Sequence, residues 1–457
     1  MLNDKSDRWL HEAARQVPRY TSYPTAHGFV PMESARYASW LAEVEGPIAL
    51  YVHFPFCSKR CTYCACSMIA TTHGDVGAAY LDLLDREAVA VSQRMKRDPV
   101  IRRLHWGGGT PTYYSSEQLE RTMRTLLNRF TFADDADLSV EVDPRVTTDR
   151  QLDTLRRLGF TRISIGVQDF APAVQASIGR LQTPKLTRHV LRKARSVGFE
   201  SVNVDLVYGL PLQTERRMEA TMETVVSMRP DRLAVYGYAH LPEAIPHQRK
   251  IDTRDVPDLN QRRRLEKIAR TNLREAGYCE IGLDHFALPE DRLAIAATDR
   301  SLYRDFMGYT TRRTPTLIGL GVSSIGDLPQ GFAQNVKKLS LYEGMLKQGQ
   351  LPVDRGLVID DDDRVRREVI QRLMCDLELR VGEIERHFDI RFDVYFEKEV
   401  AALREPGGLI DLGIVHESST GYVVDRAARS LVRNVCRVFD SRTGRRAEKE
   451  PLMSNSG

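Results

Sequence analysis

The chain has 457 residues, of which 42% are apolar and 28% charged, and its net charge is +4. This length predicts a large α/β domain with appendages, or two to three domains. The small net charge, without a long block of one sign, argues against a nucleic-acid partner. No run approaches the roughly 18 apolar residues of a membrane span, and the start lacks a signal-peptide core. We therefore expect a cytoplasmic protein without a membrane span.

The first 35 residues contain "VPRYTSYPTAHGFVP" (17–31), which is aromatic, interrupted by proline and without a clear period. We interpret residues 1–35 as an extended arm that lies on the body of the protein. A loose terminus is the alternative.

Residues 36–345 contain short β-branched apolar runs that alternate with amphipathic segments. The runs cover residues 48–56, 102–109, 138–144, 162–168, 201–211 and 232–241. Six strand–helix units in series predict parallel strands with right-handed crossovers. A complete barrel needs two further units, which are not evident, so an open partial (β/α)6 barrel of TIM type is favoured over a doubly wound sheet. Ser115 or Ser116 should cap the second helix, and Gly159 and Gly198 should end the next two.

The character of the chain changes near residue 346. Residues 346–440 read as helices, a short hairpin and a last helix, which resembles a small, mostly helical, winged-helix-like domain. Winged helices often bind DNA, but the acidic run "DDDD" (360–363) argues against it here. Residues 441–457 are predicted to form a disordered tail.

Four of the seven cysteines lie in "CSKRCTYCAC" (57–66). Cys57, Cys61 and Cys64 have the spacing C-x3-C-x2-C, and thiolates are soft ligands suited to zinc or iron–sulfur clusters. Structural zinc usually takes four ligands in two separated pairs, so this compact loop favours a 4Fe–4S cluster, with zinc or a disulfide as alternatives. Three thiolates leave one iron open for S-adenosylmethionine, and with Tyr63 the loop is typical of the radical S-adenosylmethionine superfamily. Cys279, Cys375 and Cys436 are expected to be buried.

Polar and glycine residues follow the predicted strands, where the reactive loops of such folds lie. The three glycines of the run "WGGGTP" (106–111) have no Cβ atoms, so the backbone can approach a ligand closely. A tight turn is the alternative explanation of this run. Glu141 is placed to accept from ribose hydroxyls, although a solvated charge would also explain it. With Gln168 and Asp205, these groups predict one pocket at one edge of the sheet.

Over nearly its whole length the sequence resembles the oxygen-independent coproporphyrinogen III dehydrogenases (oxidases) of heme biosynthesis. The matching motifs include "PRYTSYPTA", "LYVHFPFC", "LHWGGGTPTY", "EVDPR", "GVQDF", "NVDLVYGLP", "GYTT" and "GLGVSSI". The resemblance implies that Cys57, Cys61 and Cys64 ligate one 4Fe–4S cluster, that Cys66 does not, and that two S-adenosylmethionine molecules bind. The residues implied for the first molecule, which we call the first set, are Tyr51, Gly108, Glu141 and Ile325. Those implied for the second, which we call the second set, are Tyr63, Gly109, Thr110, Gln168, Arg180, Asp205 and Ala239. Neither Arg180 nor Asp205 is expected near the cysteine loop.

The reaction implied by the resemblance is oxidative decarboxylation of two propionates of coproporphyrinogen III to vinyl groups, by a 5′-deoxyadenosyl radical, giving protoporphyrinogen IX. Cys66 and Tyr51 are the hypothetical catalytic residues, and the arm would lie over the active site. The electron donor and acceptor are unidentified, and a monomer is expected. The alternatives are a paralogue that acts on another porphyrin-like substrate and a heme-binding or heme-transfer protein.

Two positions depart from the family pattern. Met307 stands where the family has glutamine, which removes an amide from the expected pocket. Ala65 stands where the family has glycine, and a positive φ there would cost about 1 kcal/mol.

Overall fold

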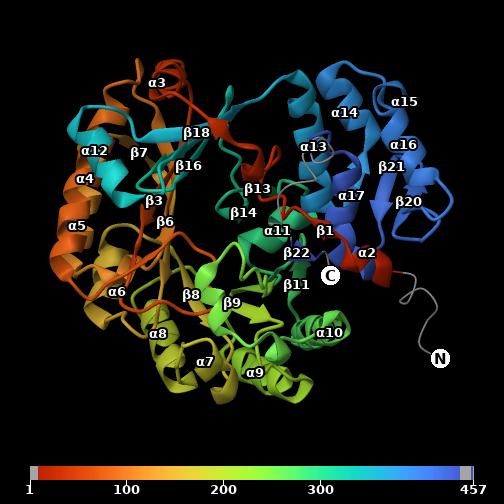
Figure 1. Cartoon of the computed structure of the whole chain (residues 1–457), viewed down its shortest axis with the longest axis horizontal. Helices are drawn as coiled ribbons and strands as arrows, with labels where there is room; N and C mark the ends of the chain where they lie inside the picture. The colour runs from red at the N-terminus through yellow and green to blue at the C-terminus, as the bar shows by residue number, and fades with distance from the viewer. Residues whose placement is uncertain (1–8, 443–453, 456–457) are drawn as a thin grey trace.

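The computed structural model describes residues 9–442 and 454–455. Within this part, a mixed sheet of 13 strands forms the centre of the molecule (Figure 1). Six of its parallel strands lie side by side in chain order: β3 (Ile48–Phe54), β6 (Val100–Gly108), β7 (Thr131–Val142), β8 (Arg162–Gln168), β9 (Ser201–Tyr208) and β10 (Arg232–Gly237). They coincide with the six predicted apolar runs. Their order lacks the reversal of a doubly wound sheet, which argues against that alternative.

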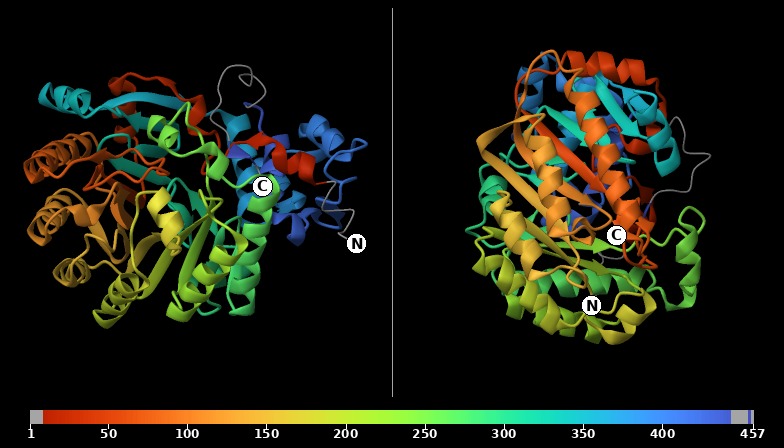
Figure 2. Two further views of the ribbon diagram at one scale, coloured as in Figure 1. Left: turned by 60° about the horizontal axis from the view of Figure 1, so that its bottom comes forward. Right: turned by 90° about the vertical axis from the view of Figure 1, so that its left-hand side faces the viewer.

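Helices connect these strands and cover the outer side of the sheet (Figures 1 and 2). They are α4 (Gly74–Ser92), α5 (Ser116–Leu127), α6 (Asp149–Arg157), α7 (Pro172–Ser177), α8 (Pro184–Ser196), α9 (Glu215–Met228) and α10 (Leu259–Glu275). The predicted helix ends are confirmed. Ser115 caps α5 in a capping box with Gln118, and Gly159 and Gly198 follow α6 and α8 with positive φ. Apolar side chains of strands and helices form one core, in which the rings of Trp106 and Phe160 lie 4.6 Å apart.

The sheet continues on both sides of the six strands. Beside β3 lies β15 (Thr316–Leu320), which is parallel to it, and then the antiparallel strands β16 (Ile325–Leu328), β17 (Gly331–Asn335), β18 (Val353–Val358) and β2 (Val30–Pro31). Beyond β10 lie β12 (His285–Ala287) and β11 (Cys279–Ile281). A separate hairpin consists of β13 (Tyr303–Asp305) and β14 (Gly308–Thr310). The remaining helices here are α3 (Ser34–Ala42), α11 (Arg292–Thr298) and α12 (Leu339–Lys347).

The C-terminal region has its own apolar core. Its helices are α13 (Asp361–Asp376), α14 (Val381–Phe388), α15 (Phe392–Tyr395), α16 (Glu397–Arg404) and α17 (Val432–Val438). A three-stranded antiparallel sheet joins them, with β21 (Gly421–Val424) between β19 (Glu378–Arg380) and β20 (Val415–Ser418). Helices and a hairpin were expected here.

The N-terminal arm packs into this C-terminal core (Figure 1). Trp9 precedes α2 (Leu10–Ala14), is buried and donates from Nε1 to the carbonyl of Leu412 (2.9 Å), and the Tyr20 hydroxyl donates to Asp440 (2.9 Å). For the described part of the arm, the interpretation as a loose terminus is therefore wrong.

Of the predicted tail, residues 443–453 and 456–457 lie outside the described residues. Ser454–Asn455 forms β22, which pairs with β1 (Gln16–Val17). Among the remaining cysteines, Cys375 and Cys436 are buried as expected, whereas Cys279, in a strand at the sheet edge, is exposed. Within the described residues, no helix combines the length and apolar character of a membrane span.

Candidate active site

Two cavities adjoin the carboxyl ends of the parallel strands. The larger cavity has a volume of about 510 Å³ and the smaller about 370 Å³. They share part of their walls, which shows that they adjoin one another. The shared residues are Arg19, Cys66, Gly108, Glu141, Tyr236 and Gly237.

The residues predicted from the motifs are distributed over these two cavities. All members of the first set line the larger cavity, and all members of the second set line the smaller cavity. Gly108 and Glu141 of the first set also line the smaller cavity. Cys57, Cys61 and Cys64 also line the smaller cavity, whereas Cys66 lines both. The strands thus bring every predicted site residue to one place, although the residues are spread over 275 positions of the chain, from Tyr51 to Ile325.

The cysteine loop fits an iron–sulfur cluster by the chemistry of its donors. Cys57 lies 3.2 Å from the Thr110 hydroxyl, and Arg145 donates from Nη2 to Cys61 Sγ (3.6 Å). Burial raises the pKa of Cys57 to about 11, and a hydrogen bond with Cys66 lowers the pKa of Cys64 to about 7. Metal binding must therefore release thiol protons.

Within the described residues, no three side chains of His, Cys, Asp or Glu are close enough to hold one metal ion. The thiolates of a 4Fe–4S cube bind different irons, so they need not converge on a single point.

The glycine run is required by close packing within the protein. Gly108 has φ +112°, and a Cβ on it would lie 2.5 Å from His53 Cε1. A Cβ on Gly109 would lie 2.7 Å from the carbonyl oxygen of Pro55, which precedes the cysteine loop. Both glycines line the smaller cavity, so the expected approach of a ligand remains compatible with this packing.

Arg180 lies beside the cysteine loop, so the expectation that it lies elsewhere is wrong. Its Nη1 is 3.9 Å from Cys61 Sγ and 3.1 Å from Asp143 Oδ2, and its Nη2 donates to the carbonyl of Gly166 (2.7 Å). The side chain is buried, and its Nε has no hydrogen-bond partner among the described residues. The segment after α7 folds back to the cysteine loop, where the backbone N–H of Thr62 donates to the carbonyl of Ile178. This contact places the positive charge of Arg180 next to Cys61.

Asp205 and Gln168 lie on the neighbouring strands β9 and β8. Asp205 accepts from the Ser164 hydroxyl (2.8 Å) and from Asn203 Nδ2 (2.7 Å). Burial raises the pKa of Asp205 to about 6, since both of these donors are neutral. Gln168 ends β8 with φ +73°, a conformation that non-glycine residues rarely adopt and that is enriched at functional sites.

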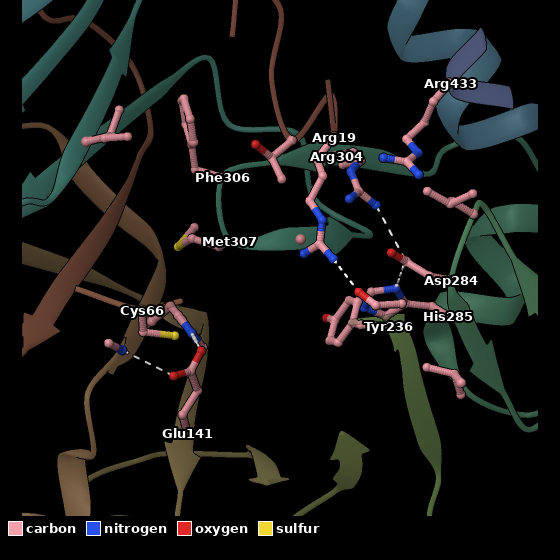
Figure 3. A pocket seen from close by; sticks show the side chains of 18 of the residues that line it. Arg19, Cys66, Glu141, Tyr236, Asp284, His285, Arg304, Phe306, Met307 and Arg433 are labelled. Atoms are coloured by element: carbon pink, nitrogen blue, oxygen red, sulfur yellow. Dashed lines mark hydrogen bonds and ion pairs between the residues drawn. The ribbon is translucent and has the colours of Figure 1, made fainter. Parts of the chain in front are cut away.

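Glu141 faces the junction of the two cavities (Figure 3). It accepts from the Gly108 amide (3.1 Å) and lies 3.3 Å from His105 Nε2. Burial opposes its ionisation, but His105, the Gly108 amide and His53 together outweigh burial and lower the pKa of Glu141. Of its side chain, 43% is accessible, and the space that it faces is the cavity, so this carboxylate is available to a ligand.

The two departures from the family pattern differ in their consequences. Met307 lines the larger cavity at the turn of the β13–β14 hairpin, so its thioether replaces an amide at the wall (Figure 3). Ala65 does not have a positive φ, so the conditional cost of alanine does not arise.

A group of arginines at the larger cavity was not predicted from the sequence. Those that line the larger cavity are Arg19, Arg262, Arg270, Arg304 and Arg433. They belong to the arm, to α10, to β13 and to α17, and their only local signal is the basic run "RRR" (262–264).

The fold and the cysteine loop define a radical S-adenosylmethionine protein, and the family model of the Radical SAM superfamily matches residues 51–225. Over 445 residues the chain is 42% identical to the oxygen-independent coproporphyrinogen III oxidase of Pseudomonas aeruginosa, with 95% of this chain and 96% of that protein covered. It is 40% identical to the protein of the same name from Escherichia coli K12, with 93% and 92% covered.

The solved structure of coproporphyrinogen III oxidase from Escherichia coli, described as a radical SAM enzyme, superimposes with a TM-score of 0.88 at 39% identity and covers 93% of this chain and 100% of that one. The chain belongs to the oxygen-independent coproporphyrinogen III oxidase family.

Proposed function

We propose that this protein catalyses the oxygen-independent oxidative decarboxylation of two propionate side chains of coproporphyrinogen III, giving protoporphyrinogen IX. The observation that carries the proposal is the pair of adjoining cavities beside the cysteine loop, with Cys66 and Glu141 at their junction. The names of the relatives support the choice of substrate.

We assign one 4Fe–4S cluster to Cys57, Cys61 and Cys64, and two S-adenosylmethionine molecules to the first and second sets. When bound, the cluster and S-adenosylmethionine supply a 5′-deoxyadenosyl radical that abstracts hydrogen. Asp205, Gln168 and Arg180 provide polar contacts for the second molecule, and Glu141 provides them for the first. Arg145 and Arg180 place positive charge next to Cys61.

The residues of the chain must orient one propionate and exclude water while it reacts. Conversion to a vinyl group removes one hydrogen atom and one electron and releases carbon dioxide. Tyr51 and Cys66 line the larger cavity, and we assign them to hydrogen or electron movement at the substrate. The electron passes to an acceptor that we do not assign, and we do not assign the donor that reduces the cluster either.

The finer architecture belongs to the same proposal. The six parallel strands would form an open partial barrel, and the C-terminal helices with their three-stranded sheet would form a winged-helix-like domain that does not bind DNA. The arm, residues 1–35, would cover the active site, with a catalytic region at 36–345 and the helical domain at 346–440. A cytoplasmic monomer is the proposed state.

The test is product analysis with anaerobically reconstituted protein, S-adenosylmethionine, a reductant and coproporphyrinogen III. Mass spectrometry should show two successive losses of carbon dioxide plus two hydrogens. A product that retains all four propionates would refute the proposal. Heme binding without turnover would favour the heme-transfer alternative, and a methylated or ring-opened product would favour another radical reaction.

A further inference from the structure

The larger cavity has a strongly basic side. Among the described residues that line it, five arginines face three carboxylates, those of Glu141, Glu266 and Asp284, which leaves two positive charges in excess. In Figure 3, Arg304 and Arg433 lie on the side opposite Cys66 and Glu141, with Arg19 between them. The cavity is therefore polarised, with the cysteine loop at one end and guanidinium groups at the other.

Arg304 is the most informative of these arginines. Its side chain is only 7% accessible, and its Nε and Nη1 have no hydrogen-bond partner in the part of the chain that the structure describes. The nearest carboxylate oxygen, Asp284 Oδ1, is 3.7 Å from Nη1, which is beyond a hydrogen bond, and the same oxygen lies 2.7 Å from His285 Nδ1. A buried guanidinium with unused donors is expensive, because the desolvated N–H groups have lost water and gained no acceptor.

The protein holds Arg304 in place from several directions. Its guanidinium carbon lies 4.5 Å from the centre of the Tyr309 ring. The strand that carries Arg304 is anchored at the next residue, because Asp305 accepts a hydrogen bond from Arg103 Nη1 (2.8 Å). The Tyr309 ring and the anchored strand thus hold the guanidinium at the wall of the larger cavity, where Figure 3 shows it beside Asp284.

Two further arginines reach the same end of the cavity from distant parts of the chain. Arg433 comes from α17, and Arg19 comes from the arm, where its Nη2 donates to the carbonyl of Gly237 (2.9 Å). Burial, and after it the charge of Arg19, lower the pKa of Arg433 to about 10. Like charges lie close together at this end of the cavity (Figure 3). An anion that enters between them would reduce their repulsion, and it would supply an acceptor for the unused donors of Arg304.

Resting on the proposed function, we infer that the Arg304 end of the larger cavity binds propionate carboxylates of the substrate that do not react in a given turnover. The ligand class is a tetrapyrrole with several carboxylate side chains. Anchoring one carboxylate at Arg304 directs another part of the ring toward Cys66 and Glu141. Arg304 then determines specificity by requiring a negative charge at a fixed position far from the reacting propionate.

The test is a binding titration that does not depend on turnover. The probe is coproporphyrin III, the stable oxidised ring with the same four propionates, followed by its fluorescence. Loss of one charge-assisted contact of about 1.5–3 kcal/mol predicts that Arg304→Gln weakens binding by about 10-fold or more, and that Arg304→Lys weakens it less. The control is Arg372→Gln, because Arg372, whose side chain is 14% accessible, pairs with Glu368 and Asp376 and lines neither cavity.

A second measurement changes the ligand in place of the protein. The tetraamide of coproporphyrin III, which is neutral at the four positions, should bind the wild type at least 10-fold more weakly than the acid. It should bind wild type and Arg304→Gln alike. Affinity for S-adenosylmethionine should stay unchanged in Arg304→Gln.

Equal binding of acid and amide by the wild type would overturn the inference, as would unchanged coproporphyrin binding in Arg304→Gln. A selective loss of S-adenosylmethionine binding would assign this end to the cofactor instead. Failure of the proposed function has a different signature, because the wild type would then form no vinyl product even if the titrations behave as expected. If only the inference fails, Arg304→Gln forms the vinyl product with an unchanged KM.

Discussion

The hydroxyl of Tyr51 donates to Nδ1 of His53, 2.9 Å away. The two residues lie two positions apart in β3, so both side chains are on the same face of the sheet. His53 Nε2 lies 2.8 Å from the carbonyl of Ser67, which can only accept, so Nε2 carries the proton and Nδ1 is free to accept from Tyr51. Burial lowers the pKa of His53 and raises that of Tyr51, which keeps both groups neutral. One phenolic hydroxyl is thus held in a fixed direction at the wall of the larger cavity.

Replacing Tyr51 by Phe should remove this hydroxyl with little change elsewhere. We expect a loss of stability of about 1 kcal/mol, the net value of one hydrogen bond, and normal iron and sulfide content. Vinyl product should fall at least 10-fold if Tyr51 acts at the substrate. Parallel assays of vinyl product and 5′-deoxyadenosine locate the defect, and full activity would exclude Tyr51 from the reaction.

The four cysteines of the loop should respond differently to replacement by Ser. Ser in place of Cys57, Cys61 or Cys64 should abolish cluster binding, because an alkoxyl is a poor soft ligand. Cys66→Ser should keep near-normal iron and sulfide and still bind S-adenosylmethionine, while decarboxylation falls steeply. Iron and sulfide analysis, together with the vinyl-product assay, distinguishes a cluster ligand from a residue that acts at the substrate. Loss of the cluster in Cys66→Ser would make Cys66 a ligand.

Gly108→Ala should damage the site through its geometry. The residue has φ +112°, and the new methyl group would meet the His53 ring at 2.5 Å. A left-handed alanine costs about 1–2 kcal/mol before this overlap is counted, so we expect destabilisation of at least about 2 kcal/mol and weakened cluster retention.

The matched control is Gly74→Ala at the start of α4, where a Cβ would meet nothing within 4 Å. Thermal unfolding of both variants measures the difference. Equal melting temperatures would contradict the packing account of the glycine run.

Asp205→Asn should change how stability depends on pH. The pKa of Asp205 is raised from 3.8 to about 6 by burial, so between about pH 4 and 6 the folded protein holds a proton that the unfolded chain releases. This contribution to stability is present below about pH 4 and is lost as pH rises through about 6. Relative to Asp205→Asn, the free energy of unfolding of the wild type should fall by on the order of 2–3 kcal/mol between pH 4 and pH 7.

Chemical unfolding of the wild type and Asp205→Asn at several pH values measures this difference. Asp361→Asn, at a side chain that is 98% accessible, serves as the control for the substitution itself. A constant offset between the wild type and Asp205→Asn at all pH values would show that the buried carboxylate does not titrate as described. Asp205→Asn should also bind less S-adenosylmethionine while its cluster spectrum stays intact.

The sequence alone was sufficient for the features that depend on nearby residues. Alternating apolar runs and amphipathic segments predicted β3 and β6–β10, because side-chain periodicity follows directly from strand and helix geometry. The cluster ligands that we propose could be chosen from the sequence because Cys57, Cys61 and Cys64 are close in the chain. The positions of Glu141, Gln168 and Asp205 followed from one topological rule, that parallel strands present their carboxyl ends at the same edge.

Only the tertiary structure decided the features that depend on contacts between distant segments. The arm packs on the C-terminal core through Trp9, Arg180 lies beside Cys61, and Arg19, Arg304 and Arg433 meet at one end of a cavity. Each of these residues reads locally as an ordinary loop, strand or helix position. Their proximity depends on how the chain closes over hundreds of residues, and the burial that gives an arginine or a carboxylate its chemistry exists only once those segments have packed together.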